Sequence, residues 1–297
     1  MSLDLTAYLD AHKALVDAAL GRLLPPETTP PETVHKSMRY SVLAPGKRLR
    51  PILVIAGAEA VGGKAEVVLE AACALEMIHA YSLIHDDLPA MDDDDYRRGR
   101  LTNHKVFGDA IAILAGDALL TLAFRLIADN AARVADPASI GQIIAQVADA
   151  AGTFGMVGGQ VVDIESEGMT VSPETLDYIH LHKTAALLRV SLRTGAMLVG
   201  AREADVAALT EAGESLGLAF QIVDDILDVE GSLEELGKTA GSDARKQKAT
   251  YPAVHGIEKS RARARDLVER TKRALEPLGS AAEPIRGLAD FVYERRS

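Results

Sequence analysis

Aspartate is concentrated in two short segments of this chain of 297 residues. Residues 86–95 and 224–228 together hold nine aspartates, and the formal net charge of the chain is −11. Without those nine carboxylates the net charge would be −2, so most of the excess is local. Such a local excess indicates a local cationic partner, and the overall sign argues against general nucleic-acid binding. The nine residues are Asp86, Asp87, Asp92, Asp93, Asp94, Asp95, Asp224, Asp225 and Asp228.

The first acidic segment follows an apolar stretch, residues 67–85, that predicts a long helix. Pro89 cannot continue a regular helix, so Asp86 lies near the helix end, where the macrodipole disfavours anions. On an unbroken helix Asp86 and Asp92 would point about 120° apart, but the interruption at Pro89 allows them to converge. The two aspartates that end the segment fit a solvated loop. The spacing does not match a calcium EF-hand, and a few carboxylates that leave room for phosphate oxygens favour magnesium.

The second acidic segment closes another apolar helix, predicted over residues 204–228. Asp224 and Asp228 are four residues apart and share a face, where their repulsion destabilises the helix unless a cation lies between them. A single pair of this kind is usually a surface feature. Two carboxylate clusters at the ends of two apolar helices predict a metal-binding region.

Two basic runs are candidates for holding anions beside these carboxylates. Gly46 is followed by Lys47 and Arg50, which would share a face if a helix begins there, and a helix N-terminus would add N–H groups for phosphate. Arg97 and Arg98 follow the first acidic segment directly. Either run alone fits a solvated surface. Combined with the acidic clusters, they predict a site in which metal ions and separate cations hold a diphosphate.

The elements that must position these residues are helices. Strand-like alternation between turn residues is hard to find, so the pattern predicts an all-α, large helical bundle in a single domain, residues 1–297. Ser172 before Pro173 predicts a capped helix start. The most hydrophobic stretch, residues 110–128, carries Asp117 and Arg125, which favours a central buried helix over a membrane span. Helices are expected at residues 67–85, 110–128, 140–151, 173–199, 204–228 and 260–275.

Other chemistries lack their motifs in this sequence. No nucleophile elbow or phosphate-binding P-loop is present. The one cysteine, Cys73, excludes an intrachain disulfide, argues against a zinc site and is expected to be buried. The N-terminus lacks the basic start and apolar run of a signal peptide. We therefore expect a cytoplasmic protein with no nucleic-acid partner and no membrane span.

These residues resemble the motifs of the trans-isoprenyl diphosphate synthases, in particular farnesyl diphosphate synthases of the bacterial type. The resemblance implies an all-α isoprenoid-synthase bundle with a central cavity, a homodimer, and several Mg2+ ions per active site, for which Mn2+ can substitute. It implies condensation of isopentenyl diphosphate with dimethylallyl or geranyl diphosphate to give (2E,6E)-farnesyl diphosphate. The motifs lie at residues 46–51, 79–87, 92–99, 183–184, 220–228 and 237–238.

The resemblance also implies a role for each matching residue. Asp86, Asp92 and Asp224 are expected to bind metal, with support from Asp87, Asp225 and Asp228. Contacts to the allylic diphosphate are expected from Arg97, Lys183 and Lys238. Contacts to isopentenyl diphosphate are expected from Lys47, Arg50, His79 and Arg98, with Gly46 in the same loop. Thr184 and Gln221 are expected to face the developing carbocation.

Product length depends in this family on the depth of the cavity below the first acidic cluster. Tyr81 lies five residues before Asp86, and an aromatic ring there accompanies a fifteen-carbon product. We therefore expect Tyr81 to floor the cavity, with ordinary core packing as the alternative.

Four other functions stay open from the sequence. A geranylgeranyl diphosphate synthase would share the site and have a deeper cavity. A terpene cyclase would not need a second set of cations, so Lys47, Arg50 and Arg98 count against it. A catalytically silent partner subunit should lack metal ligands that are intact here. A di-iron bundle needs paired Glu-x-x-His motifs, and Glu76 with His79 is the only clear match before the clusters.

Overall fold

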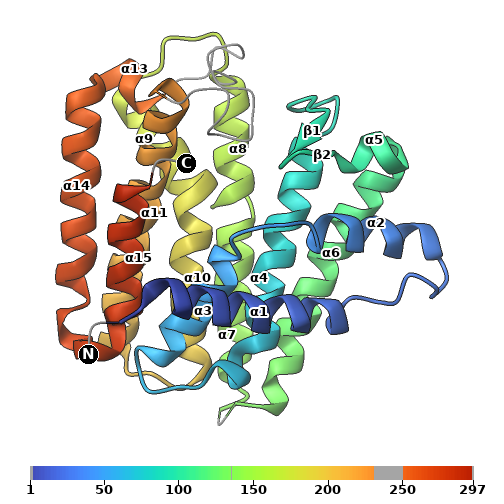
Figure 1. Ribbon diagram of the computed structural model, residues 1–297, viewed down its shortest axis with the longest axis horizontal. Helices are drawn as coiled ribbons and strands as arrows, with labels where there is room; N and C mark the ends of the chain where they lie inside the picture. Colours follow the sequence, from blue (N-terminus) through green and yellow to red (C-terminus); the bar gives the residue numbers. More distant parts are fainter. Residues whose placement is uncertain (1–2, 135, 231–249, 296–297) are drawn as a thin grey trace.

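The computed structural model describes residues 3–134, 136–230 and 250–295, and helices account for most of them (Figure 1). The expected all-α bundle is therefore confirmed. In chain order, the helices and strands are α1 (Leu5–Leu23), α2 (Glu32–Val42), α3 (Leu49–Glu59), α4 (Ala65–Asp86), β1 (Tyr96–Arg97), β2 (Arg100–Leu101), α5 (Asn103–Phe107), α6 (Asp109–Asp129), α7 (Ser139–Ala151), α8 (Met156–Glu165), α9 (Pro173–Ile179), α10 (Ala186–Leu198), α11 (Glu203–Glu230), α13 (Tyr251–His255), α14 (Ile257–Ala274) and α15 (Glu283–Glu294).

The predicted helices are present, and their ends differ from the prediction by at most three residues. The helix predicted over residues 173–199 is divided into α9, a π-helical segment, His180–Ala185, and α10. The hydroxyl of Ser172 accepts a hydrogen bond from the Thr175 N–H at 3.2 Å, which confirms the predicted cap. The apolar pattern gave no warning of the π-helical segment, because the segment is only six residues long and is flanked by α-helical turns on both sides.

Helix α4 lies inside the bundle, packed by α1, α2, α3, α6 and α10. Its apolar residues face every side because neighbours cover every side. Cys73 in this helix is fully buried, and burial raises the pKa of its thiol to about 12, so the expected structural role is confirmed. A second core forms where α11 packs against α10, α14 and α15.

Helix α6 is not the central buried helix that its hydrophobicity predicted. One stripe, which includes Ala112, Ala115 and Leu119, packs into the core. The opposite side is open, and Ile113 and Leu114 are 44% and 54% exposed. By length and composition, α4 and the segment Asp109–Ala132 that contains α6 would both be able to cross a membrane, but α4 is mostly covered by protein. Composition misled here because it does not show which sides of a helix have neighbours.

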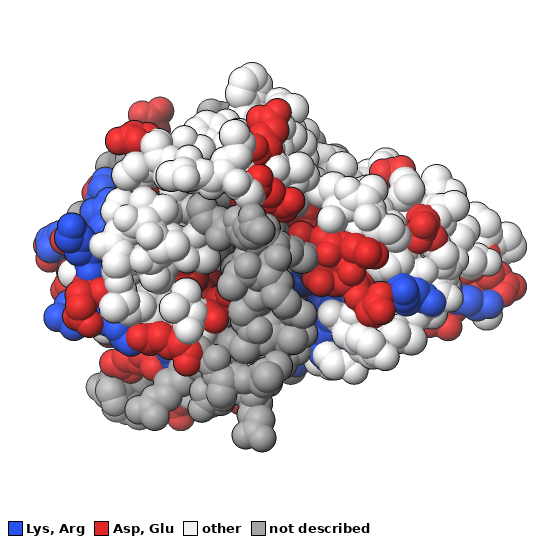
Figure 2. Space-filling model, turned by 90° about the horizontal axis from the view of Figure 1, so that it is seen from above, with Lys and Arg blue, Asp and Glu red and all other residues white. Residues whose placement is uncertain are grey.

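The acidic ends of α4 and α11 lie at the same end of the bundle, the upper end in Figure 1. A short hairpin follows the first acidic segment, with Tyr96 paired to Leu101 and Arg97 paired to Arg100. Seen from above, acidic side chains gather in the middle of this face (Figure 2). The fold therefore brings two segments more than a hundred residues apart in sequence to one face.

Candidate active site

The first acidic cluster is closed by main-chain hydrogen bonds. Helix α4 ends at Asp86, and the Asp92 N–H donates to the Asp86 carbonyl oxygen at 2.8 Å. The N–H groups of Met91 and Asp93 both donate to the Leu88 carbonyl, at 2.9 and 3.1 Å. The connector therefore turns back on itself after the helix. This brings Asp92 beside Asp86, and the predicted convergence is confirmed at the level of the main chain.

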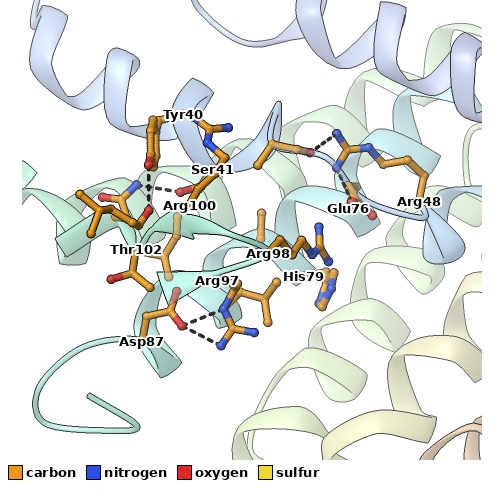
Figure 3. A pocket seen from close by; sticks show the side chains of 16 residues that line it. Tyr40, Ser41, Arg48, Glu76, His79, Asp87, Arg97, Arg98, Arg100 and Thr102 are labelled. Atoms are coloured by element: carbon orange, nitrogen blue, oxygen red, sulfur yellow. Dashed lines mark hydrogen bonds and ion pairs between the residues drawn. The ribbon is translucent and has the colours of Figure 1, made fainter. Parts of the chain in front are cut away.

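The second aspartate of this cluster points into the protein. Oδ1 of Asp87 accepts a hydrogen bond from Nε of Arg97 at 2.7 Å, and Nη2 of Arg97 lies 2.6 Å from the same oxygen as an ion pair (Figure 3). The Asp87 side chain is 5% exposed. Burial raises the pKa of Asp87, while the Arg97 guanidinium opposes that rise. Asp86 is half-buried instead. The Asp87 carboxylate is thus the ion-pair partner of Arg97, since a buried carboxylate requires a partner. The supporting metal role expected of Asp87 stays a prediction.

The second cluster repeats this arrangement. Asp225 is buried, and it accepts hydrogen bonds from the Tyr251 N–H at 2.8 Å and from Gln221 at 2.9 Å. Nε2 of His180 lies 3.2 Å from the same carboxylate. Asp224, the preceding residue, is half-buried. The oxygens of Asp225 therefore face protein donors, and its expected supporting metal role stays a prediction as well.

Asp224 carries a partner that the sequence did not predict. Nη2 of Arg295, near the C-terminus, lies 2.5 Å from Oδ1 of Asp224 and donates to the Phe220 carbonyl at 3.0 Å. Its guanidinium also lies 4.1 Å from the centre of the Phe220 ring. No local signal marks this arginine, because the contact depends on how α15 packs against α11. Asp228 lies one turn further along α11 and is half-buried.

Four predicted diphosphate contacts lie near these clusters. Lys47, Arg50 and Arg98 form a cation group, and His79 lies within the field of its guanidinium groups. Burial lowers the pKa of Arg50 to about 10, with Arg98 adding to the fall and Glu76 opposing it. Burial and the guanidinium groups of Arg50 and Arg98 lower the pKa of His79 well below its ordinary value, so its ring is neutral at pH 7. Within the described part of the chain, the buried Nε of Arg50 has no hydrogen-bond partner. These charges disfavour one another, and an anion would relieve them.

The loop that presents Lys47 is held by Arg48, which was not among the predicted site residues. Arg48 adopts a left-handed conformation with φ of 51°, and its buried side chain donates to Asp17 at 2.7 Å. It also donates to Glu76 at 2.8 Å (Figure 3). Glu76 is thus the ion-pair partner of Arg48 rather than a ligand of a di-iron site. A Cβ on Gly46 would lie 2.5 Å from Nη1 of Arg98, so glycine allows that guanidinium to cover the loop.

A pocket that opens to solvent, with a volume of about 560 Å³ including its open mouth, lies between α2, α4 and the hairpin (Figure 3). Its lining includes His79, Arg97 and Arg98, so it opens beside the cation group. Tyr81 is 6% exposed, and its ring lies edge-on to His85 at 5.7 Å between centroids. The depth of the space below Tyr81 stays a prediction.

The π-helical segment presents two of the remaining predicted residues. Lys183 Nζ donates to Oδ2 of Asp163 in α8 at 2.6 Å, and the Thr184 hydroxyl donates to Oε1 of Gln221 at 2.7 Å. Asp163 was not among the predicted site residues. Glu165 and Glu167 follow it closely, so its local sequence does not distinguish it from a solvated acidic run. Lys238 lies outside the described residues.

Metal binding itself stays a prediction. Across the described ranges, no three aspartate, glutamate, histidine or cysteine side chains come together in a group that could hold a metal ion. The first and second clusters each offer half-buried carboxylates, at Asp86 and Asp92 and at Asp224, near the same face.

Comparison with known proteins identifies the family. The polyprenyl synthetase model matches residues 31–283. The chain is 47% identical to a geranylgeranyl diphosphate synthase of Cyanophora paradoxa, covering 99% of this chain and 97% of that one. It is 46% identical to a farnesyl diphosphate synthase of Geobacillus stearothermophilus, covering 99% and 98%. The crystal structure of an FPP/GFPP synthase from Zymomonas mobilis superposes with a TM-score of 0.88 at 34% identity, covering 99% and 100%. The chain belongs to the polyprenyl synthetase family of prenyltransferases.

Proposed function

We propose that this chain condenses isopentenyl diphosphate with dimethylallyl or geranyl diphosphate and forms (2E,6E)-farnesyl diphosphate with the help of magnesium. The observation that carries the proposal is the separation of two kinds of charge at one end of the bundle. Half-buried carboxylates lie at the ends of α4 and α11, and the cation group lies beside them. One diphosphate can bind through metal ions and the other through cations directly, so the site has places for two substrates.

The residues present fit magnesium. Carboxylate oxygens are the ligands that Mg2+ prefers, and Asp224 already attracts the guanidinium of Arg295. Asp86 and Asp92, joined through the main chain, would hold metal on the other side. When bound, Mg2+ supplies neutralisation of the charge that grows on a departing diphosphate.

The chain's own cations complete the hold on the substrates. Arg97, fixed by Asp87, and Lys183 would bind the allylic diphosphate and lower the barrier to its departure. Lys47 and Arg50 would place isopentenyl diphosphate so that its double bond lies beside the allylic carbon, away from water. The neutral His79 can donate a hydrogen bond without adding charge. No protein base is assigned, since released diphosphate can take the proton that is lost after condensation.

Product length is the finer part of the proposal. The relatives include both farnesyl and geranylgeranyl diphosphate synthases. Tyr81 supports the shorter product, because a buried ring more than one turn below Asp86 shortens the space for a growing chain. Burial raises the pKa of its hydroxyl to about 12, so the ring carries no charge against the hydrocarbon. Tyr81→Ala should lengthen the product, and an unchanged product distribution would show that the ring is ordinary core. Tyr293→Ala, in α15, is the matched control.

We also propose that the protein is a homodimer in the cytoplasm. The exposed apolar side of α6 supports a second copy as the partner, since Ile113 and Leu114 are large and adjacent. Leu114→Glu should shift the protein toward monomer in sedimentation velocity, whereas Arg125→Glu on the same helix should not. A monomeric parent protein would refute the dimer.

The decisive experiment incubates purified protein and magnesium with isopentenyl diphosphate and either allylic diphosphate, and then sizes the products. We expect a fifteen-carbon product that requires both substrates, with Asp86→Ala and Asp224→Ala each removing nearly all turnover. A twenty-carbon product would indicate a geranylgeranyl diphosphate synthase. Turnover of the allylic substrate alone would indicate a cyclase, and inactivity of the pure chain would indicate a silent subunit.

A further inference from the structure

Four polar residues link the π-helical segment to α11 in one chain of contacts. His180 and Thr184 are four residues apart on the first element, and Gln221 and Asp225 are four apart on the second. The Thr184 hydroxyl donates to Oε1 of Gln221 at 2.7 Å, and Nε2 of Gln221 donates to Oδ1 of Asp225 at 2.9 Å. Nε2 of His180 lies 3.2 Å from Oδ2 of Asp225. The contacts therefore run from a buried histidine to the hydroxyl of Thr184.

Two glycines in α11 fix how the helix packs where these four polar residues meet. Gly213 and Gly217 precede Gln221 on the same face of α11, each four residues from the next. A Cβ on Gly217 would lie 2.6 Å from the Cα of Ala185, and one on Gly213 would lie 2.8 Å from the Cα of Arg189. The two backbones thus touch along this face. Such close packing leaves little freedom for the side chains that continue the same row.

The direction of each hydrogen bond follows from the chemistry of the groups. An ionised carboxylate accepts but cannot donate, and the Tyr251 N–H, which can only donate, already binds Oδ2 of Asp225 at 2.8 Å. Gln221 must therefore turn its NH2 group toward Oδ1. Its amide oxygen then faces Thr184, whose hydroxyl must donate to it. The proton of Thr184 is committed to Gln221, and the lone pairs of its oxygen point elsewhere.

We propose that Asp225 is a positioning residue rather than a metal ligand: it fixes the Gln221 amide and thereby turns the lone pairs of Thr184 toward the allylic carbocation. This inference rests on the proposed function, which places Thr184 beside that cation. A dipole that is already aimed at developing charge stabilises the transition state without reorganising during the reaction. If the amide were reversed, the Thr184 proton would face the cation instead.

Asp225→Asn tests the direction of the hydrogen bonds in this series of contacts, with almost no change in the shape of the side chain. The new side chain must keep its oxygen toward the Tyr251 N–H, so its NH2 group faces Gln221. The Gln221 amide then has to turn over, and its own NH2 group faces Thr184. We expect kcat to fall roughly 10²-fold, as when one catalytic dipole is lost, while the magnesium concentration for half-maximal rate stays as in the parent.

A double variant should restore the direction of the hydrogen bond from Thr184. In Asp225→Asn/Gln221→Glu the carboxylate and the amide exchange places, so the glutamate accepts from both the asparagine and the Thr184 hydroxyl. We expect kcat to recover to within a few-fold of the parent. A Thr184→Val background gives a second readout: Asp225→Asn should add little further loss there, because the hydroxyl that it acts through is gone.

Several outcomes would overturn the proposal. A raised magnesium requirement in Asp225→Asn would make it a metal ligand, and unchanged kcat would remove it from catalysis. Failure of the double variant to recover, with a native thermal transition, would reduce Asp225 to a packing residue. If Asp225→Asn alone does not fold, the double variant is compared with Gln221→Leu, which must lose kcat while the exchanged pair retains it. An inactive parent would refute the proposed function, whereas an active parent with these outcomes would refute this inference alone.

Discussion

The guanidinium of Arg295 lies on the carboxylate of Asp224, with 2.5 Å between Nη2 and Oδ1. The arginine side chain is only 6% exposed, and it packs over the ring of Phe220. A positive group is therefore in place at the carboxylate expected to bind metal. Arg295 also lowers the pKa of Lys47, after the larger effect of partial desolvation, so it lies close to the cation group as well.

Replacing Arg295 should ease metal binding. In Arg295→Met, a divalent cation no longer competes with the guanidinium for Asp224. If the displaced ion pair is worth about 1 kcal/mol, the magnesium concentration for half-maximal rate should fall roughly fivefold. Initial rates across a magnesium titration measure this. Arg270→Met is the control, because it removes an exposed ion-pair partner of Glu211, which lies in α11 as Asp224 does. It should leave the magnesium titration unchanged. An equal shift in both variants would contradict competition between Arg295 and the metal for Asp224.

Removing Arg48 should destabilise the protein strongly. In Arg48→Met, Glu76 is left as a buried carboxylate without its ion pair, at a cost of about 3–5 kcal/mol. Urea unfolding measures this cost. Adding Glu76→Gln should recover a large part of it, because the uncompensated charge is then gone. Arg125→Met, which breaks an exposed pair with Asp129, should change stability by less than about 1 kcal/mol.

Stability should fall in mild acid because of His79. The folded-state pKa of this histidine is well below that of the unfolded chain, about 6.5. Between those two values the unfolded chain binds a proton that the folded chain does not, so the free energy of unfolding decreases as pH falls below about 6.5. His79→Gln should lose less stability than the parent between pH 8 and pH 5.5 in urea titrations.

The matched control for that pH effect is His35→Gln in α2, which lies outside the cation group. It should follow the parent across the same pH range. A parallel decline of His79→Gln and the parent would show that His79 does not cause the acid sensitivity.

A methyl group at Gly159 should disturb Lys183. A Cβ at Gly159 would lie 2.3 Å from the main-chain nitrogen of Lys183, so one of the two backbones must move. We expect Gly159→Ala to lose about 1–3 kcal/mol of stability and to lower kcat, since Lys183 shifts relative to its substrate. Gly141→Ala in α7 meets nothing within 4 Å and should be neutral or slightly stabilising. Equal thermal stability of the two variants would argue against this close contact.

Much of the fold was predictable because helices leave a periodic apolar pattern whatever surrounds them. The turn that unites Asp86 and Asp92 was predictable too, because Pro89 has one local effect on a helix. The inward direction of Asp87 was not. Asp87 is the same residue type as Asp86, one position away. The orientation of its side chain depends on Arg97, which lies on the hairpin.

Contacts between distant elements explain the other differences. The partner of Asp224 comes from α15, and one donor to Asp225 comes from Tyr251, twenty-six residues away. The exposed side of α6 was missed for the same reason. The sequence pattern of apolar residues such as Leu114 is the same whether or not a neighbouring helix covers them. Residue types and spacing therefore predicted which aspartates gather at this end of the bundle. Tertiary packing decided which member of each Asp-Asp pair is buried against protein partners and which is half-buried.

The hydrogen bond from the Asp92 N–H to the Asp86 carbonyl has a consequence for how this site can change over evolution. Main-chain atoms, present in every residue, set the separation of the backbones of Asp86 and Asp92. Substitutions at Ala90 or Met91 can therefore accumulate without altering that separation. A deletion or insertion there would carry Asp92 out of register in a single step. Selection should preserve the number of residues in this connector more strictly than their identity.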